Sequence, residues 1–518
     1  MNKARQVAGA LQDSRAPRGK GPSMSRRHFT KCLAGAAATL IAQHRYSVSD
    51  EKRPPEEAHS KMPQVNGDGA IFFPDMHRSD VMKGFPPPED QRVTLENWAY
   101  SSTGHWRWTH LNPDRVFKSI QIERGAGPVW QLPREMIAPD RLLQAEVLWG
   151  NAASEARKIP LPEWLERADI DALVALRDGR IVAEIYTGKM TPRTRHIIWC
   201  ASKSFLSTLL APLIASGRLD EHAELTRYVP ELSKTAFSGA TIRQCLDQTT
   251  GILAQEWLDG TQLAKLDEAG KRQWDWGSPE FKRAQHALAR NSRASGLFPW
   301  LDTDPFVGYY DFLFTLHEQE YPHGRQFNYK DSNSMALQLT LERTTGISYL
   351  EHASNLISEI GFEANAGVML DPAATPVGAF GMTMTARDFA RWGQMVCARG
   401  RVGRDKVLPG QRELVDQMVS DLGPERLEGV WDPGSWPNLG YKSLFWNSAT
   451  HRGRNPVFHA AGAWGQKCLI DPAAGVVVVQ LGSSWDHDPD RIADNEVGNH
   501  AEVALWSFMQ DVVPTLVG

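Results

Sequence analysis

The sequence has no strong excess of charge of either sign. Its 57 Lys and Arg residues stand against 61 Asp and Glu residues, which leaves a formal net charge of −4. A chain with this balance gives no reason to expect binding to nucleic acid or to an anionic membrane surface. Its charged fraction of 23% and hydrophobic fraction of 42% are those of an ordinary globular protein, so most of the chain is expected to fold.

Cysteine and long apolar runs are also scarce. The five cysteines show no Cys-x-x-Cys pair and no Cys/His spacing, which argues against a zinc site and against a disulfide framework. The apolar run of residues 32–42 is too short to span a bilayer as a helix, and no other segment is long enough. The sequence therefore predicts no integral membrane segment.

The N-terminal region carries a possible export signal. "SRRHFTK" (Ser25–Lys31) precedes the short apolar run, and paired arginines in this position are typical of twin-arginine signals. We expect residues 1–42 to direct export to the periplasm or beyond. Residues 43–90 are rich in Pro, Glu and Lys and predict a linker or loosely packed lead-in, followed by a folded domain over residues 91–518.

Alternating apolar residues predict strands near both ends of this domain. Residues 171–188 form a hairpin pattern around Asp178-Gly179, and residues 467–484 form another that turns between Asp471 and Gly475. Helical spacing follows over residues 496–513. We expect an α/β (α+β) fold, with a central antiparallel sheet closed by distant parts of the chain and a mainly helical subdomain within roughly residues 200–400.

The segment "IIWCASKSFLSTLL" (197–210) predicts a helix with a reactive start. Cys200 and Lys203 are three residues apart, so both side chains can share one helical face. A helix N-terminus and a neighbouring lysine both lower a thiol pKa, which would make Cys200 a nucleophile with Lys203 as ion-pair partner or proton shuttle. The alternative is an ordinary buried cysteine beside a solvated lysine.

The wider sequence resembles a known superfamily. "IWCASKSFLSTLLAPLIASGRLDEHAELTRYVPEL" and "ATIRQCLDQTTGI" are similar to serine beta-lactamase-like hydrolases, whose Ser-x-x-Lys motif falls on Cys200–Lys203. "GRQFNYKDSNSMALQLTLERTTG" (324–346) matches the segment of the second motif at Tyr329. "FHAAGAWGQKCLIDPAAGVVVV" (458–479) matches the strand of the third motif but lacks its Lys-Thr-Gly. Together with residues 96–111 and 382–396, the chain most resembles 6-aminohexanoate-dimer hydrolases over roughly residues 90–515.

The resemblance implies a role for particular residues. Cys200 takes the place of the nucleophilic serine, Lys203 that of its general base, and Tyr329 that of the phenol that passes a proton to the leaving group. The backbone N–H groups of Cys200 and Ala463 would form the oxyanion hole. Further residues that could support the site or contact substrate are Trp257, Trp464, Asp331, Asn333 and His459.

The activity implied is that of an exported amide or ester hydrolase that works through a covalent acyl group on Cys200. It needs no metal or organic cofactor, and its partner would be a small amide, ester or short peptide. Since Lys-Thr-Gly is absent, efficient beta-lactamase activity is not expected. Three alternatives stay open: an acyltransferase that uses the same thioester, a catalytically silent protein that binds peptide or cell-wall fragments, and a serine enzyme into which the cysteine was introduced by engineering.

Overall fold

The computed structural model describes residues 63–77, 81–99, 103–150, 156–253, 265–274, 276–420, 439–448, 456–484 and 497–517. The predicted export signal, residues 43–62 of the predicted lead-in and Trp257 lie outside these residues.

A large sheet joins distant parts of the chain, as the two hairpin patterns predict. In the described residues it has nine strands in the order β1-β2-β7-β6-β17-β16-β15-β14-β13, and every neighbouring pair is antiparallel except β2 with β7. The first hairpin turns at Asp178 and Gly179, whose φ angles of 50° and 74° suit a tight turn. The strands are β1 (Gln64–Val65), β2 (Ile71–Phe73), β6 (Ile170–Arg177), β7 (Arg180–Thr187), β13 (Leu439–Lys442), β14 (Phe445–Ser448), β15 (Val457–Gly462), β16 (Gln466–Asp471) and β17 (Val476–Gly482).

Side-chain alternation along the central strands divides the core into two layers. On β6, Val174 and Leu176 point into the larger apolar cluster, whereas Leu173 and Ala175 point into the smaller one. Successive side chains of a strand face opposite sides of a sheet, so both faces of this sheet are covered. This explains why the central strands are apolar almost throughout.

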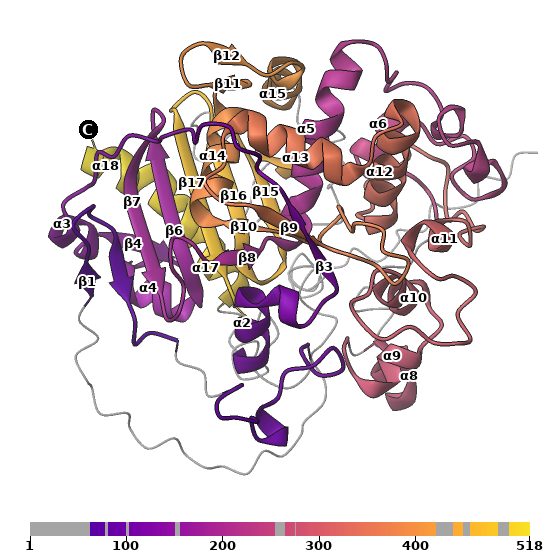
Figure 1. The fold of residues 1–518 in the computed structure, drawn as a ribbon, viewed down its shortest axis with the longest axis horizontal. Helices are drawn as coiled ribbons and strands as arrows, with labels where there is room; N and C mark the ends of the chain where they lie inside the picture. The colour runs from indigo at the N-terminus through magenta and orange to yellow at the C-terminus, as the bar shows by residue number, and fades with distance from the viewer. Residues whose placement is uncertain are drawn as a thin grey trace, which may run out of the picture.

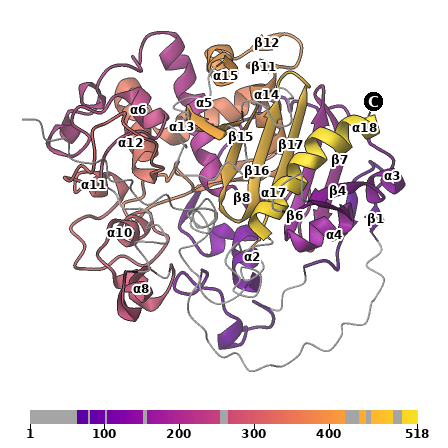
Figure 2. The same cartoon turned by 180° about the vertical axis from the view of Figure 1, so that it is seen from behind.

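Helices from different parts of the chain cover the two faces (Figures 1 and 2). Helix α14 packs on β6, β16 and β17, while α17 and α18 cross the other face. The described α-helices are α2 (Thr103–Leu111), α3 (Pro139–Leu143), α4 (Leu161–Arg167), α5 (Ser202–Ala215), α6 (Ile242–Leu246), α8 (Glu268–Trp274), α9 (Pro279–Arg283), α10 (Ala287–Ala294), α11 (Tyr309–Leu313), α12 (Asp331–Thr345), α13 (Tyr349–Ile360), α14 (Ala386–Cys397), α15 (Gln411–Ser420), α17 (Val497–Ser507) and α18 (Val513–Val517).

The region between residues 200 and 400 is mainly helical, as predicted. Helices α6 and α8–α12 gather beside the sheet in Figure 1, and α5 lies between the two parts. A four-stranded sheet in the order β3-β9-β10-β8 accompanies them; its strands are β3 (Ser119–Ile122), β9 (Ala366–Met369), β10 (Met382–Thr385) and β8 (Arg195–Ile197). Short pairs β4 (Glu146–Trp149) with β5 (Arg157–Pro160), and β11 (Arg401–Val402) with β12 (Lys406–Val407), complete the described strands.

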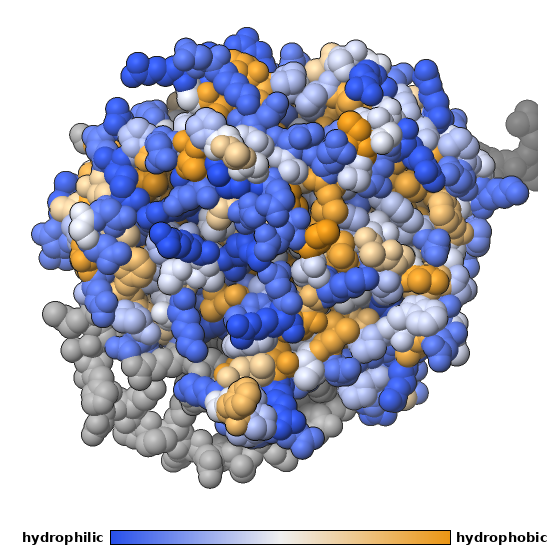
Figure 3. Space-filling model, in the orientation of Figure 1, coloured by the Kyte–Doolittle hydropathy of each residue, from blue (hydrophilic) through white to orange (hydrophobic). Residues whose placement is uncertain are grey.

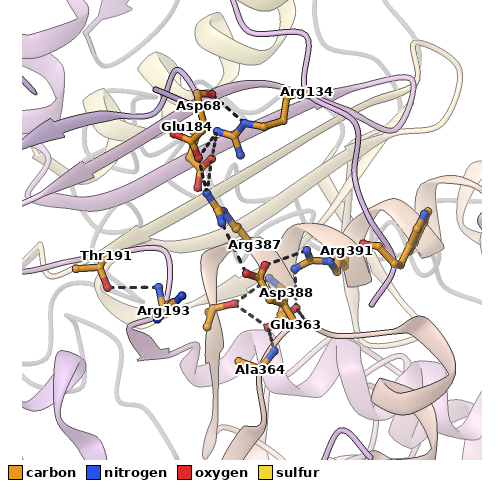
Figure 4. A network of polar contacts seen from close by, with 12 residues as sticks. Asp68, Arg134, Glu184, Thr191, Arg193, Glu363, Ala364, Arg387, Asp388 and Arg391 are labelled. Atoms are coloured by element: carbon orange, nitrogen blue, oxygen red, sulfur yellow. Dashed lines mark hydrogen bonds and ion pairs between the residues drawn. The ribbon is translucent and has the colours of Figure 1, made fainter. Parts of the chain in front are cut away.

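The predicted boundary of the folded domain at residue 91 is wrong. Strand β2 pairs in parallel with β7, and Ile71 and Phe73 are buried. The network in Figure 4 also ties Asp68 to the domain, because Arg134 and Arg387 contact both Asp68 and the fully buried Glu184. Composition suggested a linker because charged and proline residues surround this short apolar strand.

Figure 3 shows one face of the molecule as a space-filling model. On the face shown in Figure 3, hydrophilic side chains are widespread and the hydrophobic ones form small patches between them. None of the helices in the described ranges combines the length and the apolar character that crossing a bilayer requires.

Candidate active site

Cys200 lies at the start of the long helix α5, as the sequence predicts. A short 3-10 turn, η3 (Trp199–Ala201), leads directly into the helix, and the Ser202 hydroxyl donates to the Trp199 carbonyl at 2.6 Å. The Cys200 side chain is partly exposed, whereas Lys203 is fully buried one turn further on. The start of the helix therefore carries a partly exposed cysteine, and the buried lysine follows one turn later.

Three hydrogen-bond acceptors surround the Lys203 ammonium group. Its Nζ donates to Asp331 Oδ1 at 2.5 Å and to the Ala379 carbonyl at 3.2 Å, and it also hydrogen-bonds the Cys200 sulfur. A lysine ammonium has three N–H donors and no acceptor. The Asp331 carboxylate is in direct contact with the Lys203 ammonium group, so Asp331 is part of any proton transfer through it.

Tyr329 is the second side chain that hydrogen-bonds the sulfur. It precedes α12, its hydroxyl hydrogen-bonds Cys200, and the Lys203 Nζ lies 4.7 Å from its ring centroid. The ring stacks on Trp446 at 5.8 Å and meets Tyr441 edge-on at 5.7 Å. Burial raises the pKa of Tyr329 well above its usual value, so the hydroxyl keeps its proton at neutral pH.

The expectation of a lowered thiol pKa at Cys200 is wrong. Burial raises this pKa above its ordinary value; the Lys203 charge opposes the rise and the Asp331 charge adds to it. Hydrogen bonds from Tyr329 and Lys203 favour the thiolate, but they do not reverse the direction. The sequence argument included the lysine and the helix end but could not include Asp331, because this partly buried carboxylate comes from a distant part of the chain.

Buried amide side chains hold the Tyr329 segment in place. Gln248, whose φ is 55°, accepts hydrogen bonds through Oε1 from the Lys330 backbone and from Asn333 Nδ2, each at 2.8 Å. Asn333 also accepts from the Thr250 hydroxyl at 2.6 Å. Asn333 is thus a support for the start of α12. Gln248 was missed by sequence reasoning, because nothing in a lone glutamine marks it as buried.

The aromatic pair behind Tyr329 was also missed. Tyr441 and Trp446 lie on β13 and β14, and the turn between these strands contains Ser443 and Leu444 at positive φ angles of 52° and 63°. The turn is anchored to the site helix, because Ser204 Oγ donates to the Leu444 carbonyl at 2.6 Å. Ser-Leu is an unusual pair for such a turn, where Asn-Gly is the common signal, so the hairpin left no clear mark in the sequence.

The end of β15 approaches the backbone of Cys200. A Cβ added to Gly462 would lie 2.3 Å from the Ile198 carbonyl oxygen and 3.1 Å from the Cys200 nitrogen, so only glycine permits this contact. Ala463 follows and is exposed, and Trp464 then adopts a left-handed conformation with φ 60°. The two backbone segments that contain the Cys200 and Ala463 N–H groups therefore lie side by side.

Comparisons with known proteins agree with this architecture. A sequence model of the beta-lactamase family matches residues 167–502. A 6-aminohexanoate-dimer hydrolase of Paenarthrobacter ureafaciens is 30% identical over 411 residues, which cover 78% of this chain and 91% of that protein. This chain belongs to the beta-lactamase family. It is a hydrolase of the group that also includes penicillin-binding proteins.

A solved structure shows the same fold. A Bacillus anthracis protein described as a 6-aminohexanoate-dimer hydrolase superposes with a TM-score of 0.62 at 22% identity, covering 80% of this chain and 97% of that one. The predicted beta-lactamase/transpeptidase-like fold is confirmed.

The other residues proposed for this beta-lactamase family site lie in different places. Trp464 adjoins Ala463, and its ring lies 4.6 Å from that of Trp199. His459 packs edge-on against Trp506 of α17, so it is not part of the cluster around Cys200. The buried side chain of Gln466 donates to the carbonyls of Ala463 and Trp464, at 3.0 and 3.1 Å. Gln466 supports the turn after β15 and was not anticipated.

Proposed function

We propose that the protein hydrolyses an amide bond, or an ester bond, through a covalent S-acyl group on Cys200. One observation carries the proposal: the Cys200 sulfur is hydrogen-bonded by Lys203 and Tyr329, while its backbone nitrogen lies beside the Gly462–Ala463 segment. Nucleophile, proton-transfer groups and backbone donors thus converge on one point, which is the arrangement that acyl transfer requires.

The first step forms the tetrahedral adduct that precedes the thioester. The sulfur attacks the carbonyl carbon as its S–H bond breaks, and the proton passes through Lys203 to the Asp331 carboxylate. The negative charge that develops on the carbonyl oxygen is stabilised by the N–H groups of Cys200 and Ala463. Because burial raises the thiol pKa, the thiol is favoured over the thiolate before attack, which fits a proton transfer that accompanies attack.

The second step releases the amine. Tyr329 donates its phenol proton to the departing nitrogen as the C–N bond breaks, and it recovers a proton from the Lys203–Asp331 pair. The original thiol proton therefore ends on the amine, and the oxyanion collapses to the thioester. Because a thiolate leaves more readily than an amide anion, the adduct would revert without this protonation, so Tyr329 is essential for amides.

The last step regenerates the thiol. Water attacks the thioester, one of its protons returns to the sulfur through the same groups, and the acid leaves. A thioester also reacts readily with amines, and an amine in place of water would give acyl transfer. Hydrolysis is the first proposal because the named relative is a hydrolase.

We propose linear amides as the substrate class, with the 6-aminohexanoate dimer as the first compound to test, since a relative of 30% identity carries that name. The strand before Ala463 has Ala460, Ala461 and Gly462 and offers no cation for a penicillin carboxylate. We also propose export through the twin-arginine motif at Arg26-Arg27. Replacement of both arginines by lysine should retain the protein in the cytoplasm of an expressing cell.

Intact-protein mass spectrometry tests the nucleophile. We expect p-nitrophenyl acetate to add one acetyl group to the wild type and to the matched control Cys245→Ala, whose cysteine is buried on α6. Cys200→Ala should remain unmodified and should not turn over amides. Turnover that persists in Cys200→Ala would contradict the proposal.

Two further outcomes separate the alternatives. Binding of peptides without any adduct over long incubation would favour a silent binding protein. A large rise in amide turnover in Cys200→Ser would favour a serine enzyme into which the cysteine was introduced.

A further inference from the structure

A chain of buried polar side chains lies behind the oxyanion hole. It begins at Trp199, the residue before Cys200, and runs through His110 of α2 and Ser483 to Asp171 of β6. All four side chains are at most 3% exposed. No step of the proposed reaction uses any of them, although the sequence segment 96–111 that contains His110 is part of the family resemblance.

The hydrogen bonds of this chain have one possible direction. The Trp199 indole can only donate, so His110 Nε2 accepts its proton, at 3.1 Å. His110 must then carry its own proton on Nδ1, which faces the Ser483 hydroxyl at 3.2 Å. Ser483 in turn donates to the Asp171 carboxylate, which can only accept. Burial lowers the pKa of His110 well below its usual value, consistent with the neutral ring that this order requires.

The far end of the chain is firmly fixed. Asp171 accepts from Arg107 Nε through Oδ1 at 3.0 Å, and His196 Nε2 lies 3.3 Å from Oδ2, the oxygen that accepts from Ser483. The Arg107 guanidinium lowers the pKa of Asp171, so the carboxylate stays charged. Because Asp171 is a fixed acceptor, the donors Ser483, His110 and Trp199 each have one stable orientation.

The near end of the chain is where the backbone is under strain. Trp199 has φ 46°, in the left-handed region that side chains other than glycine rarely adopt. Its ring packs against Trp464, which has φ 60° and follows Ala463 on the other side of the oxyanion hole. His110 also hydrogen-bonds the Gly482 carbonyl, which accepts from Gln466, the residue that holds the turn at Ala463. One imidazole therefore links both backbone segments.

We propose that His110 is a positioning residue that orients the oxyanion hole. By holding the Trp199 indole, it keeps the backbone at Trp199 in the left-handed conformation that directs the Cys200 N–H toward the substrate oxygen. This inference rests on the proposed role of Cys200 as nucleophile. It predicts that His110 affects reactions that develop an oxyanion and leaves other reactions of the same sulfur unchanged.

Two reactions of Cys200 distinguish a role of His110 in orienting the oxyanion hole from a general role in stabilising the fold. Acylation by p-nitrophenyl acetate passes through an oxyanion, whereas alkylation by iodoacetamide does not. We expect His110→Gln to slow acylation about tenfold, in line with the cost of a small misplacement, and to leave the alkylation rate within twofold of wild type. Trp199→Phe, which removes only the indole donor and part of the ring, should behave in the same way.

A double-mutant cycle tests whether His110 acts through Trp199. The double variant should be no slower in acylation than the slower single variant, because both changes break the same link. The matched control His352→Gln, a histidine on α13 that pairs with Thr345, should acylate at the wild-type rate.

Three results would overturn the inference. They are wild-type acylation by His110→Gln, equal losses in acylation and alkylation, and additive effects in the double variant. Failure of the proposed function is a separate result, since the wild type and Cys200→Ala would then acylate alike.

Discussion

The two sides of Cys200 are built in different ways. On one side, Lys203 and Tyr329 hydrogen-bond the sulfur, and Asp331 pairs with Lys203. We call this the proton-transfer side. On the other, the oxyanion side, the proposed groups are backbone N–H groups at Cys200 and Ala463. There the side chains of Trp199 and Trp464 only fix the course of the chain.

This difference determines what each side depends on. The proton-transfer side depends on a few contacts of the Lys203 side chain, at 2.5 Å to Asp331 and at 3.2 Å to the Ala379 carbonyl. The oxyanion side depends on two left-handed tryptophans, each costing about 1–2 kcal/mol of backbone strain, which the surrounding aromatic and polar packing must offset. Changes on the first side should alter proton transfer, and changes on the second should alter oxyanion stabilisation.

Removal of the Tyr329 hydroxyl should have the largest effect. We expect Tyr329→Phe to slow amide turnover by roughly 10²–10⁴-fold, because the departing amine loses its proton donor. Hydrolysis of p-nitrophenyl acetate should fall far less, since nitrophenolate leaves without a proton. Steady-state kinetics on both substrates measure the ratio; equal losses would contradict the role of Tyr329 as acid.

Crowding the oxyanion side should have the second-largest effect on turnover. In Gly462→Ala the new Cβ would press on the Ile198 carbonyl and approach the Cys200 nitrogen. Losing an oxyanion donor costs about 3–4 kcal/mol in the barrier, so we expect amide and ester turnover to fall together by roughly 10²–10³-fold. Iodoacetamide should still alkylate Cys200. The control is Gly67→Ala, where no atom lies within 4 Å of the new Cβ and the backbone is not left-handed.

The proton-transfer side was more accessible from the sequence than the oxyanion side. Cys200 and Lys203 are three residues apart on one helix, and Tyr329 stands in a recognisable segment, so short-range patterns marked all three. The sheet was predictable for the same reason, since each hairpin is local. Gln248, Gln466 and the link from Trp199 to His110 were not, because they join segments far apart in the chain.

Neutralising Asp331 should have a smaller effect than either change above. It should speed alkylation of Cys200 and slow amide turnover. The Asp331 charge raises the Cys200 pKa, so Asp331→Asn should lower that pKa and increase the thiolate fraction at any pH below it. The pH profile of iodoacetamide alkylation should therefore shift to lower pH and the rate at pH 7 should rise. Amide turnover should fall, because the proton acceptor behind Lys203 is lost.

An acidic residue outside the site gives the control for this shift. Asp416 is exposed and pairs with Arg399, so Asp416→Asn should leave the alkylation profile unchanged. A profile for Asp331→Asn that moves to higher pH would show that Asp331 favours the thiolate through Lys203, contrary to the direction inferred here.

Replacing Trp446 should have the smallest effect on amide turnover. It should also separate the two sides most clearly, because only the proton-transfer side should be affected. Its ring stacks on Tyr329 at 5.8 Å, and such aromatic pairs contribute about 0.5–1.5 kcal/mol. We expect Trp446→Leu to slow amide turnover by up to about tenfold, because a less restrained Tyr329 donates its proton less effectively. Ester acylation and alkylation should stay near wild type, since neither needs that proton. If ester acylation fell as much as amide turnover, Trp446 would serve the oxyanion side as well, and the two sides could not be treated as separate.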